Sequence, residues 1–148
     1  MATKVLAEMR PPVSPRARVL LGRADALLSG SVGADTVSDQ FLDCYMAALR
    51  GAAAILEAAP ISTSRARSRS AWVLLVKAAP ALESWAEYFS GFSATRAALQ
   101  AGVSRSIDAS VADEFYREVG RFLHVVEDFI GAESRLDRVA SYPRSMSA

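Results

Sequence analysis

The sequence predicts an all-α fold, an up-and-down bundle of four to five helices. Apolar residues recur at helical spacing along most of the chain, and capping residues, glycines and prolines separate these stretches. Apolar residues make up 51% and charged residues 22% of the 148 residues, which is typical of a globular domain. We therefore expect one helical domain over residues 14–131, with mobile tails at 1–13 and 132–148.

The first expected helix begins at Ser14 and Pro15. A serine followed by proline is typical of an N-cap and the first helical position. This helix should reach about Leu28, where Gly30 and Gly33 can end it.

The second expected helix has the clearest apolar pattern in the chain. Asp35 or Thr36 can cap its start, and Pro60 follows its end. Its apolar face consists of Phe41, Leu42, Tyr45, Ala48, Leu49, Ala52, Ile55, Leu56 and Ala59. Its other flank is built from small residues, so a neighbouring helix can approach closely: Ala47, Gly51, Ala54 and Ala58.

The apolar run Trp72–Val76 predicts the most buried helix of the bundle, because its side chains are apolar all round. A strand is the alternative for these residues, although no other segment offers it a partner. Pro80 should make the helix kink or restart before Leu82. A short helix around 94–100 should then end at Gly102.

The last expected helix is long and amphipathic. Ser110 and Asp113 resemble a capping box at its start, and Gly131 can terminate it after about Ile130. Its apolar seam consists of Phe115, Val119, Phe122, Val126 and Phe129.

Arginine dominates the positive charge, since Lys4 and Lys77 are the only lysines among 17 basic residues. The planar guanidinium suits phosphates, but a GC-rich genome also produces an arginine-rich chain. The net charge of +1 means that any nucleic-acid contact must be a local patch. Arg65, Arg67 and Arg69 are candidates for contact with phosphate or RNA, and a solvated basic loop is the alternative.

Cys44 is the only cysteine and His124 the only histidine. A zinc site of the usual Cys/His type is therefore excluded within one chain, and we expect no metal and no cofactor. Cys44 is expected to face the core, unless His124 meets it in space as a base. The absence of an intrachain disulfide, of a secretory signal and of an apolar run of roughly 20 residues predicts a cytoplasmic protein without a membrane span.

One constellation on the last helix could carry chemistry. Arg117, Arg121 and His124 share a face opposite the apolar seam. An imidazole can move a proton near neutral pH, while guanidiniums stabilise charge on phosphate oxygens. The alternative is that the three residues are only the polar side of an amphipathic helix.

From about Arg18 to Ile130, the chain resembles the HEPN family (higher eukaryotes and prokaryotes nucleotide-binding domains), in particular a small stand-alone branch found in actinobacteria. The resemblance covers nearly the whole expected bundle and is a similarity of stretches. These stretches are residues 45–53 (YMAALRGAA), 69–75 (RSAWVLL) with Ala79-Pro80, 85–89 (WAEYF) and the last helix.

The resemblance implies a helical bundle that is commonly homodimeric. Many HEPN domains are metal-independent ribonucleases whose motif is arginine, four to six residues, then histidine. Arg117 and His124, with six residues between them, meet the loosest form of this motif. Arg117 would bind the scissile phosphate, and His124 would act as general acid or base. Glu118 departs from the polar Asn, Asp or His that often follows the motif arginine, and its charge would repel phosphate.

Two functions follow from these observations. The first is a non-catalytic, dimeric HEPN-like scaffold that binds a partner protein, a nucleotide or RNA. The alternative is a metal-independent endoribonuclease of toxin or defence type that uses the Arg-x6-His motif.

Overall fold

The computed structural model describes residues 14–59, 70–103 and 106–141, with side chains described up to Gly131. The expected tail at 1–13, the basic segment 60–69 and residues 142–148 lie outside this part of the chain. Within it, the regular structure is entirely helical, as predicted. The elements are α2 (Pro15–Ser31), α3 (Val37–Ala58), α4 (Ala71–Ala78), the 3₁₀ turn η2 (Pro80–Leu82), α5 (Glu83–Ser90), α6 (Ser93–Gln100) and α7 (Ala109–Ser141).

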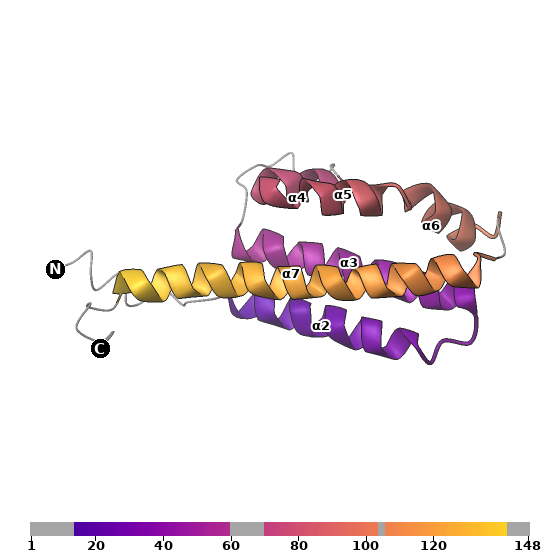
Figure 1. The fold of residues 1–148 in the computed structure, drawn as a ribbon, viewed down its shortest axis with the longest axis horizontal. Coiled ribbons are helices and arrows are strands. Elements are labelled where there is room, and N and C mark those ends of the chain that lie inside the picture. The colour runs from indigo at the N-terminus through magenta and orange to yellow at the C-terminus, as the bar shows by residue number, and fades with distance from the viewer. Residues whose placement is uncertain (1–13, 60–69, 104–105, 142–148) are drawn as a thin grey trace.

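The helices form an up-and-down bundle (Figure 1). Helix α3 packs against both α2 and α7, and the shorter helices α4, α5 and α6 lie along the side of the bundle opposite α2. Helices α2 and α7 run in opposite directions. Because α4 and α5 follow one another along the same side, the arrangement fits the predicted four to five helices.

Local signals in the sequence place several helix ends. The Ser14 hydroxyl accepts a hydrogen bond from the Ala17 N–H at 3.4 Å, and Thr36 accepts one from Asp39 at 3.0 Å. Of the two caps expected for α3, the structure therefore uses Thr36. Gly102 follows α6 with a φ of 75°, a conformation that favours glycine.

Pro80 breaks the helix as predicted, because α4 ends at Ala78 and the chain restarts as η2 and α5. Trp72–Val76 is helical, so the strand alternative is wrong. The expectation that this helix is the most buried is also wrong. Only Trp72 and Leu75 of α4 are buried, and Val73 is 43% exposed, because this short helix turns one face to α3 and α5.

Both expected ends of the last helix are wrong. The carboxylate of Asp108 caps α7 in place of Ser110, accepting hydrogen bonds from the Ser110 N–H at 2.9 Å and the Ser110 hydroxyl at 2.8 Å. At the other end, α7 continues to Ser141. Gly131 therefore lies inside the helix and does not adopt the positive φ of a glycine terminator. Within the described residues, only Gly102 has a positive φ.

Replacing Asp108 by alanine should lower the melting temperature of the chain at neutral pH. The two hydrogen bonds from Ser110 hold the pKa of the Asp108 carboxyl below its ordinary value. The carboxylate therefore stabilises the fold above the ordinary carboxyl pKa, and this contribution is lost as the pH falls through the lowered pKa. Thermal unfolding of both chains from about pH 7 to about pH 2 tests this.

The difference in melting temperature between the two chains should shrink at the acidic end. Asp108→Asn is the matched control, because its oxygen can accept the same hydrogen bonds without titrating. A penalty for Asp108→Ala that does not change with pH would contradict the assigned cap.

The core contains one buried polar contact chain among aromatic side chains. The Trp72 Nε1–H donates to the Tyr45 hydroxyl at 3.0 Å, and that hydroxyl donates to the Phe89 carbonyl at 3.4 Å. The Arg96 guanidinium covers the Tyr45 ring at 5.0 Å from its centroid. Among the described residues, every buried side-chain N and O atom has a hydrogen-bond partner.

Candidate functional site

Helix α7 exposes Arg117, Arg121 and His124 to solvent. Phe115 and Val119, on the opposite side of the same helix, are fully buried. The helix therefore separates an apolar side from an Arg/His side, as the spacing of these residues predicts.

Both arginines of this face have a carboxylate beside them. Arg117 Nη2 lies 2.8 Å from Asp113 Oδ2, one turn earlier on α7, and Arg121 forms an ion pair with Glu118. Exposed pairs of this kind stabilise a fold by at most about 1 kcal/mol. They also weaken the attraction of this face for anions, because an anion approaching either guanidinium also meets a negative charge.

The Arg/His face is divided between two hollows. Arg117 and Arg121 line a shallow depression of about 390 Å³ with Ser110, Glu114 and Glu118. His124 instead lines a groove of about 340 Å³ between α2 and α7. The three residues share a helix face, but the structure does not bring all three into one pocket.

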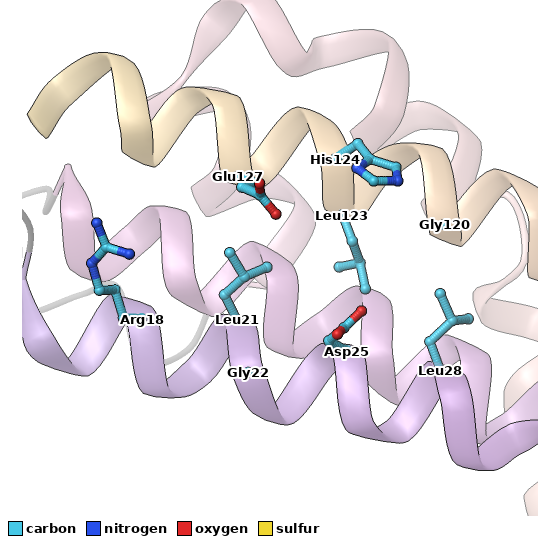
Figure 2. A pocket seen from close by; sticks show the side chains of 9 residues that line it. All are labelled: Arg18, Leu21, Gly22, Asp25, Leu28, Gly120, Leu123, His124 and Glu127. Carbon is cyan, nitrogen blue, oxygen red and sulfur yellow. The ribbon is translucent and has the colours of Figure 1, made fainter. Parts of the chain in front are cut away.

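The groove between α2 and α7 was not predicted from the sequence (Figure 2). Arg18 and Asp25 rise from α2, and His124 and Glu127 lie on α7. The remaining lining residues are small or apolar: Leu21, Gly22, Leu28, Gly120 and Leu123. The spacing of Arg18, Gly22 and Asp25 along one face of α2 is the signal that could have pointed to it.

The described part of α7 carries a net negative charge. Between Ala109 and Gly131 it carries five carboxylates against two arginines and one histidine. The same negative charge acts on Tyr88 of α5. Burial, together with the carboxylates of Glu118 and Glu114, raises the pKa of the Tyr88 hydroxyl to about 12. Negative charge at this flank opposes the approach of a phosphate.

Cys44 is fully buried, whereas His124 is exposed. The thiol donates a hydrogen bond to the Ser31 hydroxyl at 3.4 Å, and burial raises its pKa. Cys44 is therefore a core residue, as expected, and it lacks the lowered pKa of a nucleophile.

Other kinds of site find no support in the part of the chain that the structure describes. No group of three or more His, Cys, Asp and Glu side chains there is placed to hold a metal ion. No helix in that part is long and apolar enough to cross a membrane. The candidate phosphate contacts Arg65, Arg67 and Arg69 lie outside the described residues.

These observations define a small helical-bundle module with an exposed Arg/His face on its last helix. The model of the SAV_6107-like HEPN family matches residues 31–127, which is more than half of the chain. The chain therefore belongs to the HEPN family, in agreement with the resemblance found in the sequence. No curated protein and no solved structure matches it.

Proposed function

We propose that this chain is a non-catalytic HEPN module that forms a homodimer and binds a partner protein in the cytoplasm. The arrangement around Arg117 and His124 is the observation that carries the proposal. A ribonuclease of the Arg-x6-His type needs a guanidinium on the scissile phosphate and an imidazole within hydrogen-bond reach of the same phosphodiester. Here Arg117 is paired with Asp113, and His124 lines a different hollow.

Charge also distinguishes the partners that the sequence leaves open. RNA and nucleotides present dense negative charge and are held by uncompensated Lys and Arg side chains. The two arginines of the α7 face are compensated by Asp113 and Glu118, and Glu114 adds further negative charge beside them. A surface of mixed charge suits a protein partner better. The reduced, buried Cys44 is consistent with the cytoplasm.

Purified protein should leave single-stranded and structured RNA intact, with and without a metal chelator. His124→Ala and Arg117→Ala should behave like the wild type, because neither residue touches a reacting phosphate. Gel analysis of labelled RNA after incubation provides the measurement. Arg50→Ala is the matched control, because Arg50 is an exposed arginine of α3 outside the Arg/His face.

Cleavage that survives the chelator, disappears in His124→Ala and persists in Arg50→Ala would overturn the proposal in favour of the endoribonuclease. RNA binding that weakens steeply with salt, and on replacing Arg65, Arg67 and Arg69, would overturn the choice of a protein partner.

A further inference from the structure

We propose that helix α6 is a lid that opens over the core residue Tyr45 while the rest of the bundle stays folded, and that Arg96 holds it closed. The opening needs neither the proposed homodimer nor the proposed partner, because it takes place within one chain. Three features of α6 support it: its shallow packing, its contact with Tyr45 and the construction of its two ends.

Helix α6 is packed less deeply than the other α-helices of the described chain. It lies at the end of the bundle where the chain passes from α5 to α7 (Figure 1). None of its eight residues is buried, whereas each of the other described α-helices has at least two buried side chains. Its half-buried side consists of Thr95, Arg96, Ala98 and Leu99, of which Leu99 packs against the hydrophobic core. Since buried apolar surface is the main force that holds a helix in a bundle, little free energy holds α6 in place.

Arg96 makes the specific contact between α6 and the core. Its guanidinium carbon lies 5.0 Å from the centroid of the Tyr45 ring, which is within the range of a cation–π interaction. Tyr45 is only 1% exposed, so Arg96 covers a ring that belongs to the core. The hydrogen bonds of the Tyr45 hydroxyl with Trp72 and Phe89 involve no residue of α6. They can therefore hold the ring in place when α6 leaves.

Both ends of α6 are independent of the helices beside it. At its start, Phe92 occupies the N-cap position without a side-chain hydrogen bond, and it follows the exposed Gly91. At its end, the Val103 N–H donates to the Ala98 carbonyl at 3.0 Å across Gly102, which has the positive φ of a helix terminator. This bond closes the end of α6 on itself, so undocking the helix breaks no terminal bond to α7.

Native-state amide hydrogen exchange, followed by NMR, tests the opening. A free helix of eight residues is marginal in water, so the α6 amides exchange with solvent when the lid is open. In the wild type, the hydrogen-bonded amides of α6 should exchange at least about tenfold faster than the core amides of α3 and α7. Their exchange should also depend less on denaturant, because opening the lid exposes little surface.

Substitutions at Arg96 test what holds the lid. Arg96→Ala should accelerate the exchange of the α6 amides about two- to thirtyfold, the range that corresponds to the loss of a cation–π contact. Alanine favours a helix at least as well as arginine, so faster exchange reports the lost contact and not a weaker helix. Arg96→Lys keeps a cation over the ring and should retain most of the protection. Arg50→Ala is the matched control on the exposed surface of α3 and should leave the exchange of α6 unchanged.

A substitution on the far side of the bundle separates opening of the lid from unfolding of the whole chain. Leu28 is buried on α2, opposite the side along which α6 lies. Leu28→Ala should accelerate the exchange of the core amides of α3 and α7 at least about tenfold, because it lowers the stability of the whole bundle. The contacts of Leu28 stay formed when only α6 opens, so the exchange of the α6 amides should not change. Circular dichroism checks that every variant stays helical.

The lid is contradicted if the α6 amides share the exchange rates and the denaturant dependence of α3 and α7. It is also contradicted if Leu28→Ala accelerates the α6 amides as much as the core amides, because α6 would then open only with the whole bundle. If Arg96→Ala leaves the exchange of α6 unchanged, Arg96 does not hold the lid closed. None of these results alters the proposed function, whose own test is the fate of RNA.

Discussion

Replacing Phe115 by alanine is expected to lower the free energy of unfolding by about 3–5 kcal/mol, the cost typical of a truncated core aromatic. Phe115 is fully buried on α7. Its ring centroid lies 4.5 Å from that of Phe41 on α3 and 4.8 Å from that of Phe92, which precedes α6. It also contacts Phe89 of α5 at 5.9 Å. Since one ring joins the last helix to three other parts of the bundle, the cavity left by alanine cannot close by moving one neighbour.

Denaturant unfolding measures this effect as a lower midpoint with an unchanged slope, which indicates that the denatured state is unaffected. Val111→Ala is the control, because Val111 lies one turn earlier on α7 and is 38% exposed. That substitution should change the free energy of unfolding by no more than about 0.5 kcal/mol. A Phe115→Ala penalty as small as the control's would show that the aromatic cluster is not packed as described.

Helix ends could be predicted where the signal is local. The Ser14-Pro15 start, the break at Pro80 and the turn at Gly102 all depend on the backbone chemistry of one or two residues. Tertiary packing does not compete with these signals strongly enough to move them, so the structure follows them.

The errors occur where a local signal competes with its neighbours. At the start of α7, the carboxylate of Asp108 accepts the hydrogen bond from the Ser110 N–H. This cap takes the place of the capping box expected from Ser110 and Asp113. Gly131 lowers helix propensity by only about 1 kcal/mol, which the surrounding residues of α7 overcome. The burial of α4 depends on how many helices surround it. The spacing of apolar residues along the sequence does not predict the number of neighbouring helices.

The candidate site was only partly accessible from the sequence. Helical spacing predicted that Arg117 and His124 share a face. The pairing of Arg117 with Asp113 also follows from their separation of four residues on a helix. The groove could not be predicted in this way, because Arg18 and Asp25 line the same hollow as His124 only after α2 packs antiparallel to α7.

Replacing Gly51 by leucine should lower the free energy of unfolding by about 1–3 kcal/mol, the usual cost of overpacking a core. Gly51 lies on the small-residue flank of α3 and faces Phe122 and Leu123 of α7. A Cβ at this position would lie 2.7 Å from Leu123 Cδ2 and 3.2 Å from Phe122 Cε2. Phe122 is fully buried, so its ring has no free space to move into, whereas the Leu123 side chain borders the groove between α2 and α7. The clash should exceed the gain in helix propensity over glycine, which is at most about 1 kcal/mol.

Gly30→Leu is the matched control for this substitution. A Cβ at Gly30 meets nothing within 4 Å, so the substitution there changes only the helix propensity. The free energy of unfolding should therefore stay the same or rise. A double-mutant cycle locates the clash: Gly51→Ala should cost less in a Leu123→Ala background, because that change removes the nearest atom. If Gly51→Leu unfolds at the wild-type denaturant midpoint, α3 and α7 do not approach as closely as the structure places them. If only the cycle shows no coupling, Phe122 rather than Leu123 limits the space at Gly51.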